Sequence, residues 1–193
     1  MLRLSAIFLL IGSFVLSAVL TAVAKKLSAR AGFVAHPAEN RYHQGVIPLG
    51  GGIAIFATLM LFILAAIVVV KFLAVPGYLD WLGESITIHT AGFLNRLDQL
   101  LIVLLAVLVL FALGLFDDKK HLGPLFKLSV QFAVAIVAAA FADIRVEFFI
   151  ENKIITSAFS AVWIVLIINA FNFLDNMDGA SAGIAVIASC IIF

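Results

Sequence analysis

The sequence predicts an all-α protein, a polytopic bundle of transmembrane helices. Hydrophobic residues make up 65% of its 193 residues and charged residues only 12%, whereas about a quarter of the residues in a soluble domain are charged. The mean hydropathy is +1.24. Long apolar segments alternate with short polar connections, and the chain contains no run of Lys and Arg that would indicate nucleic-acid binding. We therefore expect a multi-pass membrane protein without a soluble module.

Six apolar segments define the expected helices. They are Leu4–Ala24, Gly50–Val70, Leu100–Phe116, Leu128–Ile144, Ile154–Leu174 and Ala180–Phe193. A helix needs about 17 to 25 apolar residues to cross a bilayer. The first five segments meet this length, so we expect five complete spans, and the sixth is cut short at the last residue. We interpret residues 1–193 as a single transmembrane domain, the N-terminal part of a longer protein.

The placement of Lys and Arg predicts an orientation. With the N-terminus outside, seven basic residues lie on the cytoplasmic side and five on the outer side, and the short first loop carries four of the seven. Positive charge favours cytoplasmic loops, and early loops tend to dominate. The same orientation places every polar motif of the chain on the cytoplasmic side. We therefore expect a protein of the inner (plasma) membrane with its N-terminus outside and its site facing the cytoplasm.

The first motif is the loop 36–48, which leads into Gly50, Gly51 and Gly52. Prolines and glycines fix a turn here, and residues without side chains let another backbone or a substrate approach closely. Arg41 and His43 are the side chains that would meet a phosphate. From these residues alone, a positively charged cytoplasmic loop with packing glycines is the simpler interpretation.

The second motif is the aspartate pair Asp117-Asp118, followed by Lys119, Lys120 and, further on, Lys127. Adjacent carboxylates at a membrane face suit magnesium, which binds hard oxygen ligands shared with substrate phosphates. Crowding also makes one carboxylate of such a pair a better proton acceptor. Alternatively, the pair forms ion pairs with the neighbouring lysines and caps the next helix, and both interpretations stay open at this point.

The third motif repeats a polar residue every three positions. Asn169, Asn172, Asp175 and Asp178 share this spacing, and Gly179 follows the last of them. Residues three apart are neighbours on a helix, so the run predicts a polar strip along an apolar surface. Helix capping explains one residue well, and Asn also joins transmembrane helices. Four polar groups at membrane depth are costly, however, and this favours a functional site.

Two smaller observations lie outside these motifs. Gln131 sits in the fourth apolar segment, and we interpret it as an interhelical hydrogen-bonding residue rather than a site residue. Residues 85–90 alternate in polarity, which predicts a short strand in the outer loop.

Together, these motifs resemble the polyprenyl-phosphate N-acetylhexosamine-1-phosphate transferases of glycosyltransferase family 4, which include starter enzymes of O-antigen and teichoic-acid synthesis. The similarity rests on the loop from His43 to Leu49 with its glycines, on the aspartate pair, and on the run Asn-Ala-x-Asn-x-x-Asp-x-x-Asp-Gly that begins at Asn169. Order and spacing both match. The loop is most similar to that of the undecaprenyl-phosphate GlcNAc-1-phosphate transferases.

The resemblance implies a reaction. An oxygen of polyprenyl phosphate attacks the sugar-linked phosphate of a UDP-sugar, magnesium offsets the charge, and UMP leaves. The implied donor is UDP-GlcNAc, the implied partners are the UDP-sugar, the lipid phosphate and the bilayer, and a homodimer stays open. The implied role is in cell-wall or lipopolysaccharide biosynthesis. Manganese is the alternative to magnesium.

The resemblance also assigns roles to residues. Asp117 and Asp118 are the implied catalytic pair, with Asp117 the better candidate base. Asp118 and Asn172 are implied metal contacts, with the main magnesium ligand expected beyond residue 193. The implied substrate-binding residues are Lys127 at the pyrophosphate, Asn172 beside it, Asp178 near the uracil, Asp175 in support, and Arg41 and His43 in the loop.

The chain departs from the family pattern in three respects. Arg41 stands between Asn40 and Tyr42 where the family has more basic residues, and Asn176 replaces a common glycine. A later magnesium-binding aspartate and a later loop rich in His and Arg are not reached before Phe193. We therefore expect the 193-residue polypeptide to insert into membranes without activity of its own.

The alternatives at this stage are a transferase for UDP-MurNAc-pentapeptide, an ion-pathway membrane protein and a noncatalytic fragment. An ion pathway would spread carboxylates through the depth of the membrane.

Overall fold

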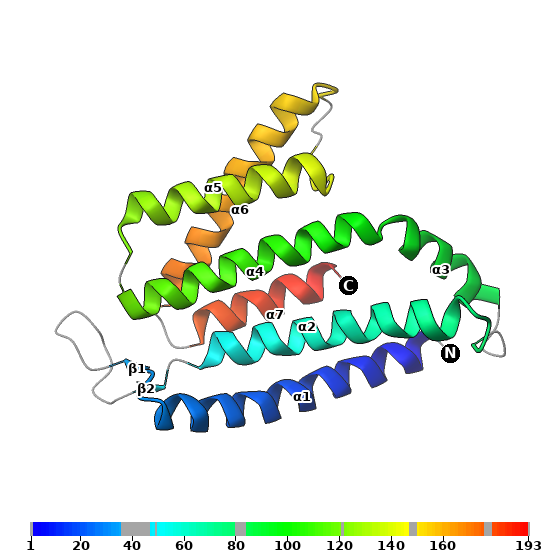
Figure 1. The fold of residues 1–193 in the computed structure, drawn as a ribbon, viewed down its shortest axis with the longest axis horizontal. Helices are drawn as coiled ribbons and strands as arrows, with labels where there is room; N and C mark the ends of the chain where they lie inside the picture. The colour runs from blue at the N-terminus through cyan, green and yellow to red at the C-terminus, as the bar shows by residue number, and fades with distance from the viewer. Residues whose placement is uncertain are drawn as a thin grey trace. The chain divides into compact units, whose positions relative to one another are not determined.

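The computed structural model describes residues 2–35, 47–48, 50–79, 84–120, 122–146, 150–175 and 179–192. Helices dominate this part of the chain (Figure 1). They are α1 (Leu2–Arg30), α2 (Gly51–Val69), the π-helix η1 (Val70–Ala74), α3 (Glu84–Asn95), α4 (Leu97–Lys120), α5 (Pro124–Phe141), α6 (Lys153–Leu174) and α7 (Ala180–Ile192). The predicted all-α class is confirmed.

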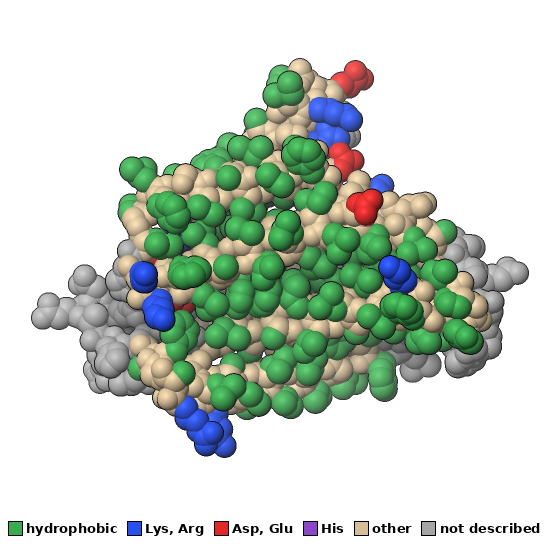
Figure 2. All heavy atoms as spheres, viewed as in Figure 1, with side chains coloured by type: hydrophobic (Ala, Val, Ile, Leu, Met, Phe, Trp, Pro, Cys, Tyr) green, Lys and Arg blue, Asp and Glu red, His purple; other side chains and the backbone are tan. Residues whose placement is uncertain are grey.

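Five of the helices are long and apolar enough to cross a membrane: α1, α2 with η1, α4, α5 and α6. Large hydrophobic side chains lie exposed along them, among them Phe8 on α1 and Leu125 on α5. Figure 2 shows the same pattern, with hydrophobic side chains covering the helices in view. The chain is a multi-pass membrane protein, and α7 is the shorter apolar helix that follows the spans.

The chain divides into two compact units, Met1–Leu97 and Asp98–Phe193. In the first unit, α1 and α2 run antiparallel and pack along their length (Figure 1). Gly50, directly before α2, lies close against α1. A Cβ atom at Gly50 would lie 2.7 Å from Ser28 Oγ and 3.0 Å from the Ala24 carbonyl oxygen, so only glycine fits there without displacing α1.

A two-stranded antiparallel sheet joins α1 to α2. Strand β1 (Val34–Ala35) pairs with β2 (Ile47–Pro48), with Val34 opposite Pro48 and Ala35 opposite Ile47. The residues on either side of 36–46, Ala35 and Ile47, are therefore paired. Arg41 and His43 belong to this segment and lie outside the described residues.

The predicted strand over residues 85–90 is wrong. These residues belong to α3, which contacts η1. A six-residue strand without a partner would leave its backbone groups unpaired, whereas a helix satisfies them internally. Gly77, in the turn that follows η1, has a φ of 86°.

In the second unit, α5 and α6 form the most extensively packed pair of helices. They cross near the middle of both helices (Figure 1). The crossing point is a cluster of Ala135, Ala161 and Val165, flanked by Phe132 and Ile164. Small side chains let transmembrane helices approach closely, because packing rather than the hydrophobic effect holds them together in lipid. Asn152 caps the start of α6, where its side chain accepts the backbone N–H groups of residues 154 and 155.

Candidate functional site

The aspartate pair lies on the last turn of α4, not in a loop after it. Asp117 Oδ1 accepts the backbone N–H of Leu122 at 3.0 Å. This bond closes the turn toward α5, which begins at Pro124 after Gly123 in an extended conformation. Proline suits the first position of a helix because its missing N–H would have no partner there. The sequence therefore places both carboxylates at the point where α4 gives way to α5.

Lys127 connects three helices of this unit. Its ammonium lies 2.7 Å from Asp117 Oδ2 on α4 and 3.4 Å from Asn172 Oδ1 on α6. The Lys127 and Asp117 side chains are 20% and 25% exposed. The end of α4, the start of α5 and the end of α6 lie on one side of the unit (Figure 1). A single basic side chain thus joins the second and third sequence motifs.

Deeper along the same two helices, Asn169 pairs with Gln131. Asn169 Nδ2 donates to Gln131 Oε1 at 2.7 Å and to the Val165 carbonyl oxygen at 2.8 Å. Gln131 is 2% exposed. Gln131 lies one turn from Lys127 on α5, and Asn169 lies one turn from Asn172 on α6. The polar strip predicted on α6 is therefore matched by a polar strip on α5. The predicted interhelical role of Gln131 is confirmed.

These side chains surround a cavity of about 380 Å³. Five residues predicted from the sequence line it: Asp117, Asp118, Lys127, Asn172 and Asp175. Asp175 is the C-cap of α6 and is exposed. Asp178 lies outside the described residues, as do Arg41 and His43. Gly179, which follows Asp178, has a φ of 76°, as expected for a turn into α7.

The cavity also includes residues that sequence reasoning missed as site residues. Ser181, on the first turn of α7, and Gly114, one turn before Asp117 on α4, both line it. Ser181 follows the polar run by only a few positions, and this proximity was the available signal. Gly114 lies at i−3 from Asp117 on the same helix. A Cβ atom added at Gly114 would have nothing within 4 Å, so this position leaves room beside the aspartate pair.

The donor atoms of the cavity suit a magnesium ion. Three carboxylates, Asp117, Asp118 and Asp175, face one described cation, Lys127, so the described lining carries an excess of negative charge. A phosphate-bearing ligand would need added positive charge to enter such a cavity. Among the described residues, no three His, Cys, Asp or Glu side chains form a ready-made metal site. This arrangement fits magnesium, which usually takes one or two carboxylates and completes its shell with phosphates and water.

Comparison with known proteins relates the second half of this chain to one family. Residues 100–193, which include the whole described cavity, match the model of "Glycosyl transferase family 4". Over these residues the chain is similar to that family. No solved structure matches the chain.

Several curated relatives of this chain are bacterial. It is 29% identical to an undecaprenyl-phosphate alpha-N-acetylglucosaminyl 1-phosphate transferase of Thermotoga maritima, over 93% of this chain and 48% of the relative. It is 27% identical to the enzyme of the same name from Escherichia coli, over 95% and 44%. It is 28% identical to a decaprenyl-phosphate N-acetylglucosaminephosphotransferase of Mycobacterium tuberculosis, over 89% and 40%. The chain spans less than half of the length of each of these relatives.

Proposed function

We propose that this chain is a member of glycosyl transferase family 4 and carries part of the site at which N-acetylglucosamine-1-phosphate is transferred from a UDP-sugar to polyprenyl phosphate, with release of UMP. The observation that supports the proposal best is Lys127, which bridges Asp117 and Asn172 at the edge of an acidic cavity. The names of the relatives supply the substrate class. The orientation we propose puts this cavity at the cytoplasmic face of the inner membrane.

In the proposed reaction, an oxygen of polyprenyl phosphate attacks the sugar-linked phosphorus of the donor. A new P–O bond forms, the P–O bond to UMP breaks, and UMP leaves with the bonding electrons. Such chemistry depends on positioning and on charge stabilisation more than on covalent help from the protein. Magnesium, held by Asp118 and Asn172 with Asp175 beside them, would supply positive charge to the pyrophosphate oxygens.

Lys127 and Asp117 have complementary tasks in this proposal. Without substrate, the Lys127 ammonium neutralises the Asp117 carboxylate at 2.7 Å. A pyrophosphate in the cavity offers Lys127 a second, doubly charged partner. When Lys127 turns toward the pyrophosphate, Asp117 Oδ2 becomes available to accept a proton from the polyprenyl phosphate. Asn172, already 3.4 Å from the ammonium, lies beside Lys127 in both arrangements.

The experiment that tests the function measures UMP release by the full-length gene product, because we expect no activity from residues 1–193 alone. Membranes containing it are given undecaprenyl phosphate with either UDP-GlcNAc or UDP-MurNAc-pentapeptide, with and without a chelator. We expect release with UDP-GlcNAc, dependent on Mg²⁺ or Mn²⁺. Preferential use of the muramyl-pentapeptide donor would contradict the assignment to the simple-sugar branch. No release with either donor would contradict the transferase assignment.

A further inference from the structure

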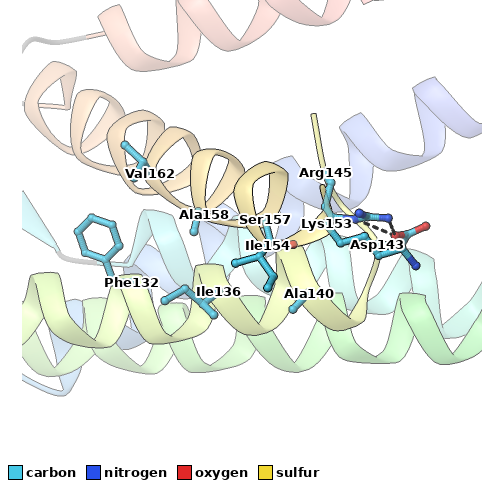
Figure 3. Close-up of a pocket in the computed structure, with 11 residues that line it drawn as sticks. Phe132, Ile136, Ala140, Asp143, Arg145, Lys153, Ile154, Ser157, Ala158 and Val162 are labelled. Atoms are coloured by element: carbon cyan, nitrogen blue, oxygen red, sulfur yellow. Dashed lines mark hydrogen bonds and ion pairs between the residues drawn. The ribbon is translucent and has the colours of Figure 1, made fainter. Parts of the chain in front are cut away.

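A second cavity lies between α5 and α6 at the end of the pair opposite the candidate site. Its volume is about 550 Å³, within the range of small-molecule sites. Phe132 and Ile136 of α5 face Ile154 and Val162 of α6 across it (Figure 3). Small side chains such as Ala158 form its floor, so the groove exists because large residues stand on either side of small ones.

Charged residues of both signs line one end of this groove. Figure 3 shows Asp143, Arg145 and Lys153 together at that end, away from Phe132 and Val162. Arg145 forms an ion pair with Asp143, with its Nε 2.9 Å from Asp143 Oδ1. The Arg145 side chain is only 9% exposed, whereas that of Asp143 is 50% exposed. Asp143 has a φ of 57°, a left-handed conformation that Asp tolerates better than most residues.

The charged end of the groove lies too far from the candidate site to hold the reacting phosphate. Lys127 and Asp143 are separated by most of α5, which corresponds to roughly 24 Å at about 1.5 Å per residue. Because α5 and α6 both qualify as membrane spans, the apolar walls lie at hydrocarbon depth and the charged end lies at the opposite polar interface. A ligand of this groove therefore has a polar group at the interface and an apolar body in the bilayer.

We infer that this groove binds one glycerophospholipid of the bilayer, with a zwitterionic ethanolamine headgroup. An acyl chain lies against Ile136, Ile154 and Val162, of which Ile154 is 81% exposed without a ligand. The phosphodiester meets Lys153 and the buried guanidinium of Arg145, and the primary ammonium donates to Asp143.

The two signs of charge select this headgroup. A purely anionic headgroup would satisfy Lys153 but would offer no charged N–H donor to the Asp143 carboxylate. A choline headgroup carries positive charge but has no N–H to donate to that carboxylate.

A binding titration of the purified chain in detergent tests the inference without reference to catalysis. Native mass spectrometry counts bound dioleoyl phosphatidylethanolamine, phosphatidylglycerol and phosphatidylcholine. We expect one phosphatidylethanolamine to bind more tightly than the other two lipids. Lys153→Ala should weaken this binding about tenfold, as the loss of one charge-assisted hydrogen bond implies. Lys71→Ala is the matched control, because Lys71 is an exposed lysine of the other unit, on η1.

A second variant fills the groove without touching a charge. Ala158→Leu places a larger side chain on its floor and should abolish retention of the lipid, while Ala133→Leu, at an exposed position of α5 outside the lining, should not. Preference for phosphatidylglycerol, equal binding of all three lipids, or a chain that dimerises instead of binding lipid would overturn the inference. So would unchanged binding in both Lys153→Ala and Ala158→Leu. None of these outcomes depends on transferase activity.

Discussion

The Lys127 ammonium forms an ion pair with the Asp117 carboxylate at 2.7 Å, and this contact joins the start of α5 to the end of α4. Both side chains are partly exposed, so the pair contributes little to stability, about 0 to 1 kcal/mol for pairs of this kind. The ion pair instead serves to position the Lys127 ammonium, which also contacts Asn172 on α6. Variants of these residues should therefore change activity much more than stability.

The first prediction concerns Lys127. Lys127→Ala removes the cation that we place at the pyrophosphate, so kcat/KM for UMP release by the gene product should fall by about two to three orders of magnitude, as when a charge-stabilising group is lost. Lys119→Ala is the control, since Lys119 lies on the last turn of α4 outside the cavity lining. An equal loss in both variants would indicate that general positive charge, not the position of Lys127, matters.

The second prediction concerns Asp117. Asp117→Asn keeps an oxygen for the Leu122 N–H but cannot act as a base, so kcat should fall by about 10²- to 10⁴-fold. The melting temperature should change by only a few degrees, because the pair with Lys127 is partly exposed. Thermal unfolding in detergent beside the activity assay separates these effects. A variant that is fully active would remove Asp117 from the mechanism.

The third prediction concerns the Asn169–Gln131 pair. Asn169→Leu leaves the buried Gln131 amide without this partner, which should destabilise the chain by about 1 to 2 kcal/mol. Adding Gln131→Leu replaces both polar groups and should restore most of the stability, because an apolar pair needs no hydrogen bond. Chemical unfolding of the two single variants and the double variant measures the coupling. Additive effects would show that the two amides do not act as a pair.

The fourth prediction concerns Gly50. Gly50→Ala puts a Cβ atom against Ser28 Oγ and the Ala24 carbonyl oxygen, so it should loosen the packing of α1 on α2 at a cost of about 1 to 3 kcal/mol. Its φ of −114° suits alanine, so the effect is steric rather than conformational. Gly51→Ala is the matched control, since nothing lies within 4 Å of its added Cβ. Equal melting temperatures for the two variants would contradict the close approach.

Hydrophobic runs predicted most of the fold. The apolar segments correspond to α1, α2, α4, α5, α6 and α7, with ends displaced by a few residues because helices continue into polar positions such as Asp117 and Arg30. The alternation of polarity at residues 85–90 led to the wrong prediction of a strand, because a pattern of six residues is too short to distinguish a strand from an amphipathic helix. The division of the chain at Leu97 had no sequence signal.

Spacing predicted the polar strip on α6, and helix-end positions predicted that the aspartate pair would meet it. Specific contacts between side chains on different helices could not be predicted from the sequence. Lys127 and Asn172 are far apart in sequence, and only the crossing of α5 over α6 decides that they share a hydrogen bond. Ser181 lines the cavity because α7 begins directly after the turn at Gly179. Neither its residue type nor a periodic spacing in the sequence indicates this position as a site residue.

The alanine crossing of α5 and α6 also has a mechanical meaning. Ala135 and Ala161 contact near the midpoint of both helices, and their small side chains let the two helices meet closely at one point, with Phe132 and Ile164 beside it. The crossing can therefore act as a fulcrum with two arms of similar length. A change of the crossing angle would displace the Lys127 end and the Lys153 end together. Binding of a molecule at one surface of the bilayer would then shift the residues at the other surface.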